Sequence, residues 1–226
     1  ENILLKPNHW LPVSLKDLNP GDFAMILGYP GRTQRYATSY EVDELLEITH
    51  PNRIKIRGLR QELMMSDMQN DQKVNIQYAA KYSGSSNYWK YSIGQKAGLE
   101  RLNVKGKKQE IENQLNSWIA SDAGRKATYG SALDLISNAM KGRAEYANAQ
   151  QYLNECFYQG TELLYFSTAF SILASALEAE DKEVTESYIS RIKTLTESFY
   201  KNYNPPTDRK VTKAMIDLYR KDVPAK

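Results

Sequence analysis

The sequence has a single cysteine, Cys156, in 226 residues. One cysteine allows neither an internal disulfide bond nor a cysteine-based metal cluster, so disulfide-rich and zinc-finger classes are excluded. Cys156 lies between Glu155 and Phe157 in a helical pattern. We therefore expect a small side chain on a helix face and not a nucleophile.

Histidine is almost as rare, with only His9 and His50 in the chain. His9 precedes Trp10 at the start of a candidate strand, and His50 precedes Pro51 at the expected start of a helix, so we interpret both as loop or capping residues. No His-x-x-x-His pattern and no carboxylate cluster with ligand spacing occurs, and we predict no metal ion and no cofactor. One acidic helix face is interpreted as solvated surface: Asp43, Glu44 and Glu47.

Strong charge of one sign and long apolar runs are also missing. Thirty basic against 27 acidic residues give a net charge of +3, and basic runs such as Lys105–Lys108 are short. Nucleic-acid binding requires a concentrated basic face, so we predict no nucleic-acid partner. The richest apolar stretch, Leu163–Leu177, is interrupted by serines and a threonine. It falls short of the roughly 18 consecutive apolar residues of a membrane span, and we predict none.

The first 38 residues favour short β-strands. Trp10–Leu15 and Phe23–Leu27 are apolar runs of strand length, separated by the turn residues Asn19–Asp22. A sheet that is stable alone needs about three strands or more. The partner strands are therefore expected to come from elsewhere in a longer protein.

Residues 39–226 are typical of helices with short breaks. Thr38 and Glu41 match a capping box at the start of a first helix, which should end before a second helix that opens at Pro51. Ser83–Asn87 should kink the third helix, because these residues compete with helix formation, and Thr207 is predicted to cap the last helix. The expected helical ranges are about 39–48, 51–68, 71–82, 88–102, 105–121, 129–158, 161–179, 182–203 and 207–221. The fold class is therefore mainly α, an irregular antiparallel helical bundle with a short N-terminal β segment.

The chain shows no complete set of catalytic residues. A chymotrypsin-like site needs a serine, a histidine that takes its proton and an aspartate that orients the histidine. No Gly-x-Ser-Gly turn occurs, and Ser85 lies in a helical region. Asp22 follows a glycine in a turn and most simply caps that turn. We assign no catalytic residue.

Three segments carry a resemblance to a known family: Gly21–Val42, which includes Gly28-Tyr29-Pro30-Gly31, then Ile54–Glu62 and Lys81–Lys90. They resemble the bacterial dipeptidyl-peptidase 7 and dipeptidyl-peptidase 11 family of chymotrypsin-like serine peptidases. The likeness is specific from about Pro12 to Leu102 and beyond that is mainly one of helical pattern.

The resemblance implies a double β-barrel enzyme with a large inserted helical domain that covers the active-site cleft. Residues 1–38 would be part of the barrel and residues 39–226 the helical cap domain. The catalytic histidine and aspartate would lie upstream of the chain and the serine downstream, so this piece would be inactive alone. The implied partners are the rest of the barrel, peptide substrates and a second copy in a homodimer. The implied location is extracytoplasmic, in the bacterial periplasm.

Two groups of residues are candidates for a role in such a cap. The expected hinge is the junction of the two parts, at Tyr36, Ala37, Thr38, Ser39 and Tyr40. Asn87, Tyr88 and Trp89 could face a peptide or a neighbouring domain, the alternative being a helix-packing kink. The alternative function is a free-standing helical module that binds peptides or proteins without catalysis and pairs its strands with a partner's sheet edge.

Overall fold

The structure is a computed structural model and describes residues 6–23, 25 and 33–224. The chain divides into two compact units, Glu1–Arg35 and Tyr36–Lys226, and each is described by itself.

The described residues of the first unit contain no strand. Leu11, Val13 and Leu15 are at least 85% exposed, as expected for a segment without sheet partners. The predicted turn is present: Asp22 N–H donates to Asn19 O, and Asn19 N–H donates to Asp22 Oδ2. The candidate strand at 23–27 lies mostly outside the described residues, so the assignment of this unit to a β-barrel stays a prediction.

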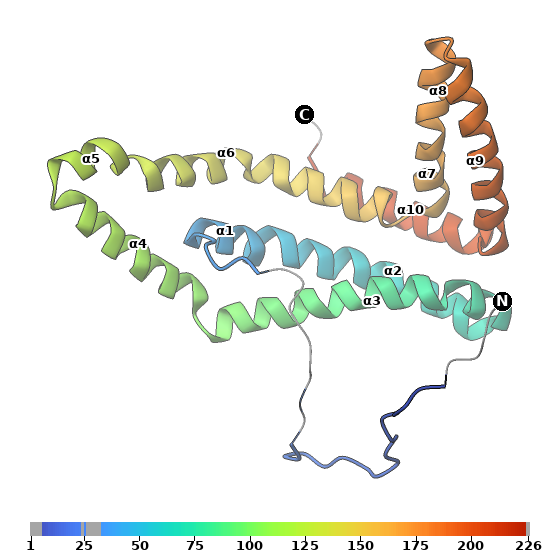
Figure 1. The fold of residues 1–226 in the computed structure, drawn as a ribbon, viewed down its shortest axis with the longest axis horizontal. Helices are drawn as coiled ribbons and strands as arrows, with labels where there is room; N and C mark the ends of the chain where they lie inside the picture. The colour runs from blue at the N-terminus through green and yellow to red at the C-terminus, as the bar shows by residue number, and fades with distance from the viewer. Residues whose placement is uncertain (1–5, 24, 26–32, 225–226) are drawn as a thin grey trace. The chain divides into compact units, whose positions relative to one another are not determined.

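The second unit is helical, which confirms the mainly α class (Figure 1). Its helices are α1 (Ser39–Glu44), α2 (His50–Asn70), α3 (Gln72–Arg101), α4 (Val104–Ala120), α5 (Ala123–Tyr129), α6 (Ala132–Leu153), α7 (Glu162–Ser167), α8 (Ser171–Glu178), α9 (Lys182–Lys201) and α10 (Pro205–Asp222). Two π-helical turns, η1 (Leu45–Thr49) and η2 (Asn154–Tyr158), and a 3-10 turn, η3 (Thr168–Phe170), continue neighbouring helices.

The core lies where α2, α3, η2 and α10 meet, and α2 packs most extensively on α3 (Figure 1). Each large apolar side chain buried here stabilises the unit by about 1.5–3 kcal/mol. The fully or almost fully buried apolar residues of this cluster include Ile56, Met64, Val74, Tyr78, Tyr152, Cys156, Val211 and Met215. Beyond this core, α7, α8 and α9 form a helical hairpin (Figure 1).

The capping box predicted for the first helix is confirmed, and Asp71, where the third helix was expected to begin, proves to be its cap. Thr38 and Glu41 form the predicted capping box at α1. Asp71 caps α3 by accepting from the backbone N–H groups of Lys73 and Val74. Both signals act within four residues of the helix start, so they depend little on the rest of the fold.

Two predicted helix boundaries are wrong. The chain does not stop between the first two helices: the π-helical turn Leu45–Thr49 leads directly into α2, with Pro51 in its first turn. A proline lacks the N–H that a continuing α-helix would use, and the widened turn accommodates it. Asn204, not Thr207, caps α10, because its side chain accepts from Thr207 N–H and Pro205 opens the helix.

The predicted kink at Ser83–Asn87 is also absent, and α3 runs without interruption. Ser85 and Ser86 are buried in the helix pair that α3 forms with α2. Small side chains allow two helices to approach closely, and tertiary packing outweighs weak helix propensity. The small residues are therefore a packing surface and not a helix break.

The long helices predicted for 129–158 and 161–179 are each divided. α5 ends at Tyr129 and α6 begins at Ala132, so a short turn separates them. The 3-10 turn Thr168–Phe170 separates α7 from α8. Apolar spacing persists through such turns, which is why periodicity alone does not reveal them.

Candidate functional site

The candidate peptide-facing residues lie in the second half of α3. Asn87 is exposed, and no hydrogen bond of its carboxamide occurs within the described part of the chain. Tyr88 is 54% exposed. Trp89 is half-buried, and its indole Nε1–H donates to Ile54 O at 3.0 Å, which ties α3 to α2. Asn87 and Tyr88 are thus available to a partner, whereas Trp89 has a packing role.

A glycine on α2 makes room for Trp89. A Cβ added at Gly58 would lie 3.3 Å from Trp89 Nε1, closer than most real Cβ contacts. The indole therefore packs against the backbone of α2 at Gly58. This contact fixes the part of α3 that carries Asn87 and Tyr88.

Arg57 of α2 also contacts the segment of α3 that carries Asn87 and Tyr88. Its guanidinium lies 5.1 Å from the centre of the Tyr88 ring, within the range of a cation–π contact. Its Nη1 donates to Ser85 O at 3.4 Å, and its Nε donates to Glu155 Oε2 at 2.6 Å. One buried arginine therefore links the exposed tyrosine to the core.

Glu155 is the centre of a buried ion cluster. Its side chain is 1% exposed, and its second oxygen accepts from Arg53 Nε at 2.8 Å. The carboxylate thus binds two arginines of one α2 face and is contributed by the π-helical turn η2. Such turns are often found at functional positions. The cluster holds α2, α3 and η2 in register behind Asn87 and Tyr88.

Sequence reasoning missed this cluster. Arg53 and Arg57 are four residues apart and share a helix face, a spacing that could have drawn attention to them. Glu155 gave no local signal, since it lies 102 and 98 residues from its two partners along the chain.

The predicted hinge residues lie at the start of the helical unit. Tyr36 is 92% exposed. Ser39, in contrast, is buried, and both its N–H and its hydroxyl donate to the Glu112 carboxylate of α4 at 2.6 Å. Ser39 and Tyr40 belong to α1. Any bending at this junction is therefore expected at Tyr36 and Ala37, before the capping box.

The residues to which the sequence analysis gave no functional role differ in their surroundings. His9 is exposed in irregular chain, as expected of a loop residue. Cys156 is fully buried, and burial together with Glu155 and Asp222 raises the pKa of its thiol to about 12, so it is not a reactive thiolate. The acidic face is not simply solvated: Asp43 pairs with Lys105 at 2.7 Å and Glu44 with Arg143 at 3.0 Å.

His50 is not a cap or loop residue but is 1% exposed within the start of α2. Its ring contacts Tyr91 edge-on at 6.1 Å between centroids. Burial lowers the pKa of His50. The positive charges of Arg53 and Lys96 lower this pKa further, whereas a contact with Gln95 raises it. The core thus favours the neutral imidazole.

The stability of the helical unit is expected to fall as the pH drops below 6.5, the ordinary histidine pKa. The folded state resists protonation of His50 more than the unfolded chain does, so the unfolded chain binds more protons in this window. Asp67 and Asp222 also have lowered pKa values, but their contribution is lost only below the carboxylate range near 3.8. Urea unfolding between about pH 5 and pH 8 measures the slope.

His50→Gln should flatten this slope, and the exposed His9→Gln is the matched control that should leave it unchanged. A wild-type slope in His50→Gln would show that another group is responsible.

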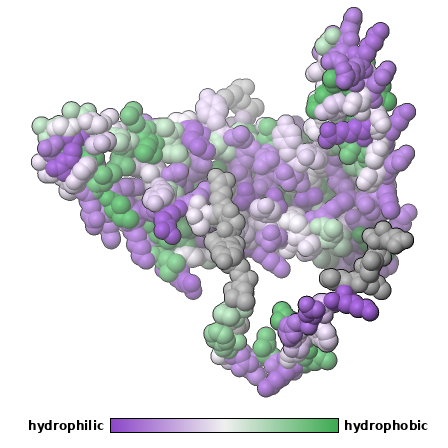
Figure 2. Space-filling view, in the orientation of Figure 1, coloured by the Kyte–Doolittle hydropathy of each residue, from purple (hydrophilic) through white to green (hydrophobic). Residues whose placement is uncertain are grey.

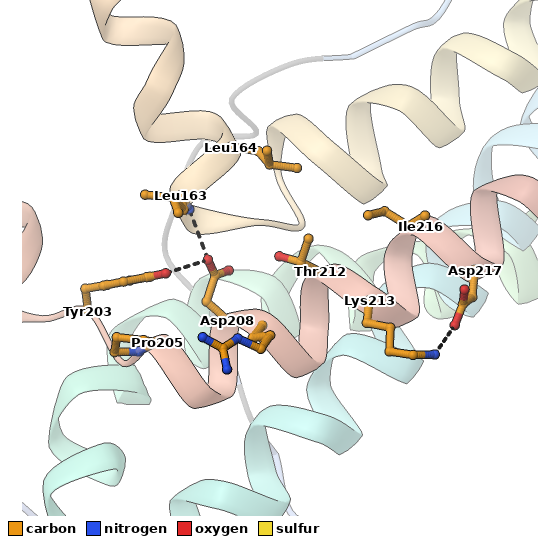
Figure 3. Close-up of a pocket in the computed structure, with 10 residues that line it drawn as sticks. Leu163, Leu164, Tyr203, Pro205, Asp208, Thr212, Lys213, Ile216 and Asp217 are labelled. Carbon is orange, nitrogen blue, oxygen red and sulfur yellow. Dashed lines mark hydrogen bonds and ion pairs between the residues drawn. The ribbon is translucent and has the colours of Figure 1, made fainter.

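Asp208 of α10 joins the helical hairpin to the core. Its carboxylate accepts from the backbone N–H of Glu162 at 2.9 Å. It also accepts from Leu163 N–H at 3.1 Å and from Tyr203 Oη at 3.2 Å (Figure 3). Burial and Asp208 raise the pKa of Tyr203 to about 12. A pocket of about 400 Å³ lies beside these residues. Because the carboxylate is already satisfied by the hairpin, we interpret this pocket as a packing gap.

The described residues form neither a metal-binding cluster nor a single membrane-spanning helix. In the described ranges, no three His, Cys, Asp or Glu side chains come together in a way that could hold a metal ion. No single described helix has the length and apolar character of a membrane span, and the one pair of segments that passes the test together, Ala123–Tyr158 and Glu162–Glu178, is bent by 94°.

Comparisons with known proteins agree on one group. A family model described as Peptidase S46 matches residues 1–226. The chain is 37% identical over 225 residues to a dipeptidyl-peptidase 7 of Porphyromonas gingivalis, covering 100% of this chain and 30% of that protein. It is 32% identical to an Asp/Glu-specific dipeptidyl-peptidase of Flavobacterium psychrophilum, covering 99% of this chain and 31% of that protein.

The fold agrees with the sequence comparison. The crystal structure of Porphyromonas endodontalis DPP11 in complex with the dipeptide Arg-Glu matches with a TM-score of 0.70 and 31% identity. The match covers 87% of this chain and 28% of that chain. The chain therefore spans about 30% of the length of the curated relatives it matches.

Proposed function

The chain belongs to the peptidase S46 family, and on that premise we propose that it is the helical cap domain of a serine dipeptidyl peptidase with a short piece of the barrel. Residues 1–38 belong to the barrel, and residues 39–226 cover the active-site cleft. The observation that carries the proposal is that the family match extends over the whole chain, although the chain spans only about 30% of its curated relatives.

The catalytic residues of this proposal lie outside the chain. His9 is in irregular chain, and His50 is enclosed in the core. A cap contributes differently: it restricts the cleft to chain ends and shields the reaction from bulk water, as lids do in other enzymes. The cap thus supports release of dipeptides from peptide N-termini.

Asn87 and Tyr88 are the residues that we propose to face the peptide. A free carboxamide can both donate to and accept from a peptide backbone. Tyr88 adds a flat apolar surface whose position is fixed by Arg57. Trp89 belongs to the support and not to the peptide surface, because its N–H is already bonded to α2.

The surface of α4 and α6 supports a larger assembly. Apolar side chains are exposed along these helices. Figure 2 shows green areas among polar residues over this part of the visible face. They are Ile111, Leu115 and Trp118 on α4, and Leu135 and Ile136 on α6. Clustered exposed apolar residues mark contact surfaces, so the rest of the peptidase or the second copy of a homodimer is proposed to cover them.

The proposed location is the bacterial periplasm. It follows from the resemblance to the dipeptidyl-peptidase 7 and 11 family. Export of the full-length protein, followed by fractionation of the cells, would test it.

Stiffening the junction is expected to lower turnover of the intact peptidase several-fold. Ala37→Pro fixes one backbone dihedral and restricts Tyr36, the most exposed residue of the junction. Opening and closing of lids sets turnover in many enzymes, so kcat should fall more than binding changes. Steady-state kinetics with a fluorogenic dipeptidyl substrate measures the effect.

The matched control is Ala123→Pro, which places proline in the first turn of α5, directly after its cap Asp122. Kinetics that remain unchanged in Ala37→Pro would remove the junction as a hinge.

Sequencing the native coding DNA on both sides of this segment tests the proposed function as a whole. A histidine and an aspartate upstream, with a Gly-Asn-Ser-Gly-like turn downstream, are expected. The longer protein should then release dipeptides, and the 226-residue chain alone should not. Stop and start signals directly flanking the segment would instead indicate a free-standing binding module.

A further inference from the structure

A second pocket lies at the base of the helical hairpin, between α2, α3, η2, α7 and α9. Its volume is about 670 Å³, and we call it the Arg60 pocket after the arginine of α2 that lines it. None of the residues discussed above as hinge or peptide-facing lines it. It is thus a separate feature of the helical unit.

Arg60 differs from the other arginines of its helix face. Its Nε is buried and has no hydrogen-bond partner among the described residues. Arg53 and Arg57 share Glu155, so this carboxylate is already engaged. Burial lowers the pKa of Arg60, and Glu162 is its strongest favourable charge, but no ion pair joins the two in the described structure. A buried N–H group without a hydrogen-bond partner is costly, and an anion bound at Arg60 Nε would remove that cost.

The charges around the pocket favour an anion. Arg60 and Lys81 are the cationic residues of its lining, and Glu162 is the anionic one, which leaves one net positive charge. Glu162 is held by Lys81, which also donates to Asn202 O. Arg60 is therefore the group that remains available to a ligand.

The rest of the lining is apolar and aromatic. Phe166 and Phe199 stack with ring centroids 4.2 Å apart and an interplanar angle of 12°. Tyr165 is 56% and Leu195 40% exposed beside them. An aromatic wall next to a cation suits a ligand that carries both an apolar group and a negative charge.

From this geometry we propose that the Arg60 pocket binds a carboxylate attached to an apolar or aromatic group. The planar guanidinium of arginine binds a carboxylate through two parallel N–H···O bonds, and the aromatic wall suits the apolar group attached to it. The proposal does not depend on the cap function, because it uses only residues of the helical unit.

Binding of N-acetyl-phenylalanine to the 226-residue chain, followed by NMR titration, tests the proposal. The acid should bind at least about tenfold more tightly than N-acetyl-phenylalaninamide, which has the same shape without the charge. Equal binding of acid and amide, or no binding of the acid up to its solubility limit, would overturn it.

Substitutions provide the second arm. Arg60→Gln should weaken binding of the acid about tenfold or more, whereas Arg125→Gln on α5, outside the pocket, should not change it. Arg60→Lys keeps the charge and should retain part of the affinity, which guards against a variant that merely fails to fold. Unchanged affinity in a folded Arg60→Gln would contradict the proposal.

A carboxylate for this pocket has two sources: the C-terminus of a short peptide and an acidic side chain elsewhere in a longer protein. If the longer protein still binds the acid, the pocket serves a free ligand. If only the 226-residue chain binds it, an acidic side chain of the longer protein occupies the site.

Discussion

Replacing Glu155 with glutamine is expected to lower the free energy of unfolding of the helical unit by about 3 kcal/mol or more. The substitution keeps the shape of the side chain but removes the charge that Arg53 and Arg57 share at 2.8 and 2.6 Å. Breaking a buried pair on one side leaves uncompensated charge in the core. Here two arginines lose their partner at once. Urea unfolding followed by circular dichroism measures the loss.

Glu186→Gln is the matched control for this experiment. Glu186 is an exposed residue of α9, and the same chemical change there should alter stability by no more than about 0.5 kcal/mol. A further variant separates charge from packing. Replacing Glu155, Arg53 and Arg57 together by apolar residues of similar size should recover much of the lost stability, because an apolar core avoids the cost of desolvating charges. A wild-type midpoint in Glu155→Gln would show that the cluster contributes little.

Replacing Asn87 with alanine is expected to lower kcat/KM of the intact peptidase about tenfold to a hundredfold, with little change in stability. The carboxamide is exposed and makes no hydrogen bond within the described structure, so its loss should not disturb the helix. Hydrogen bonds to a charged group, such as a peptide's terminal amine, are worth about 1.5–3 kcal/mol, which sets this range. Steady-state kinetics with a dipeptidyl substrate and thermal unfolding provide the two readouts.

Asn113→Ala is the control for Asn87, because Asn113 is also exposed on a helix, in α4. Tyr88→Phe keeps the ring over Arg57 and should have a smaller effect than Asn87→Ala. An Asn87→Ala enzyme with wild-type kcat/KM would remove this residue from the peptide surface.

Local signals predicted the ends of some elements but not their packing. The Thr38 capping box was readable because its atoms lie within three residues of each other. The fate of Ser83–Asn87 could not be predicted in this way. Whether small residues break a helix or fill a helix interface depends on the neighbouring helix. Ser85 lies under Arg57 of α2, a contact across 28 residues of sequence.

The candidate site shows the same division. Asn87, Tyr88 and Trp89 were proposed together from composition, and the structure separates them: Trp89 is bonded to α2, whereas Asn87 and Tyr88 are exposed. The environment of His50 also depends on packing. A histidine before a proline suggests a helix start, but only the arrangement of α2 and α3 encloses the ring.

The sequence by itself determined the helical character of residues 39–226, the absence of a complete catalytic set and the family to which the chain belongs. These properties depend on residue types and short spacings, which the sequence states directly. Only the tertiary structure decided that Arg53 and Arg57 share Glu155 while Arg60 keeps no hydrogen-bond partner in the described ranges. The three arginines look alike along α2. The carboxylate that Arg53 and Arg57 share comes from a segment about a hundred residues away, so the fold alone selects which of the three charges is neutralised.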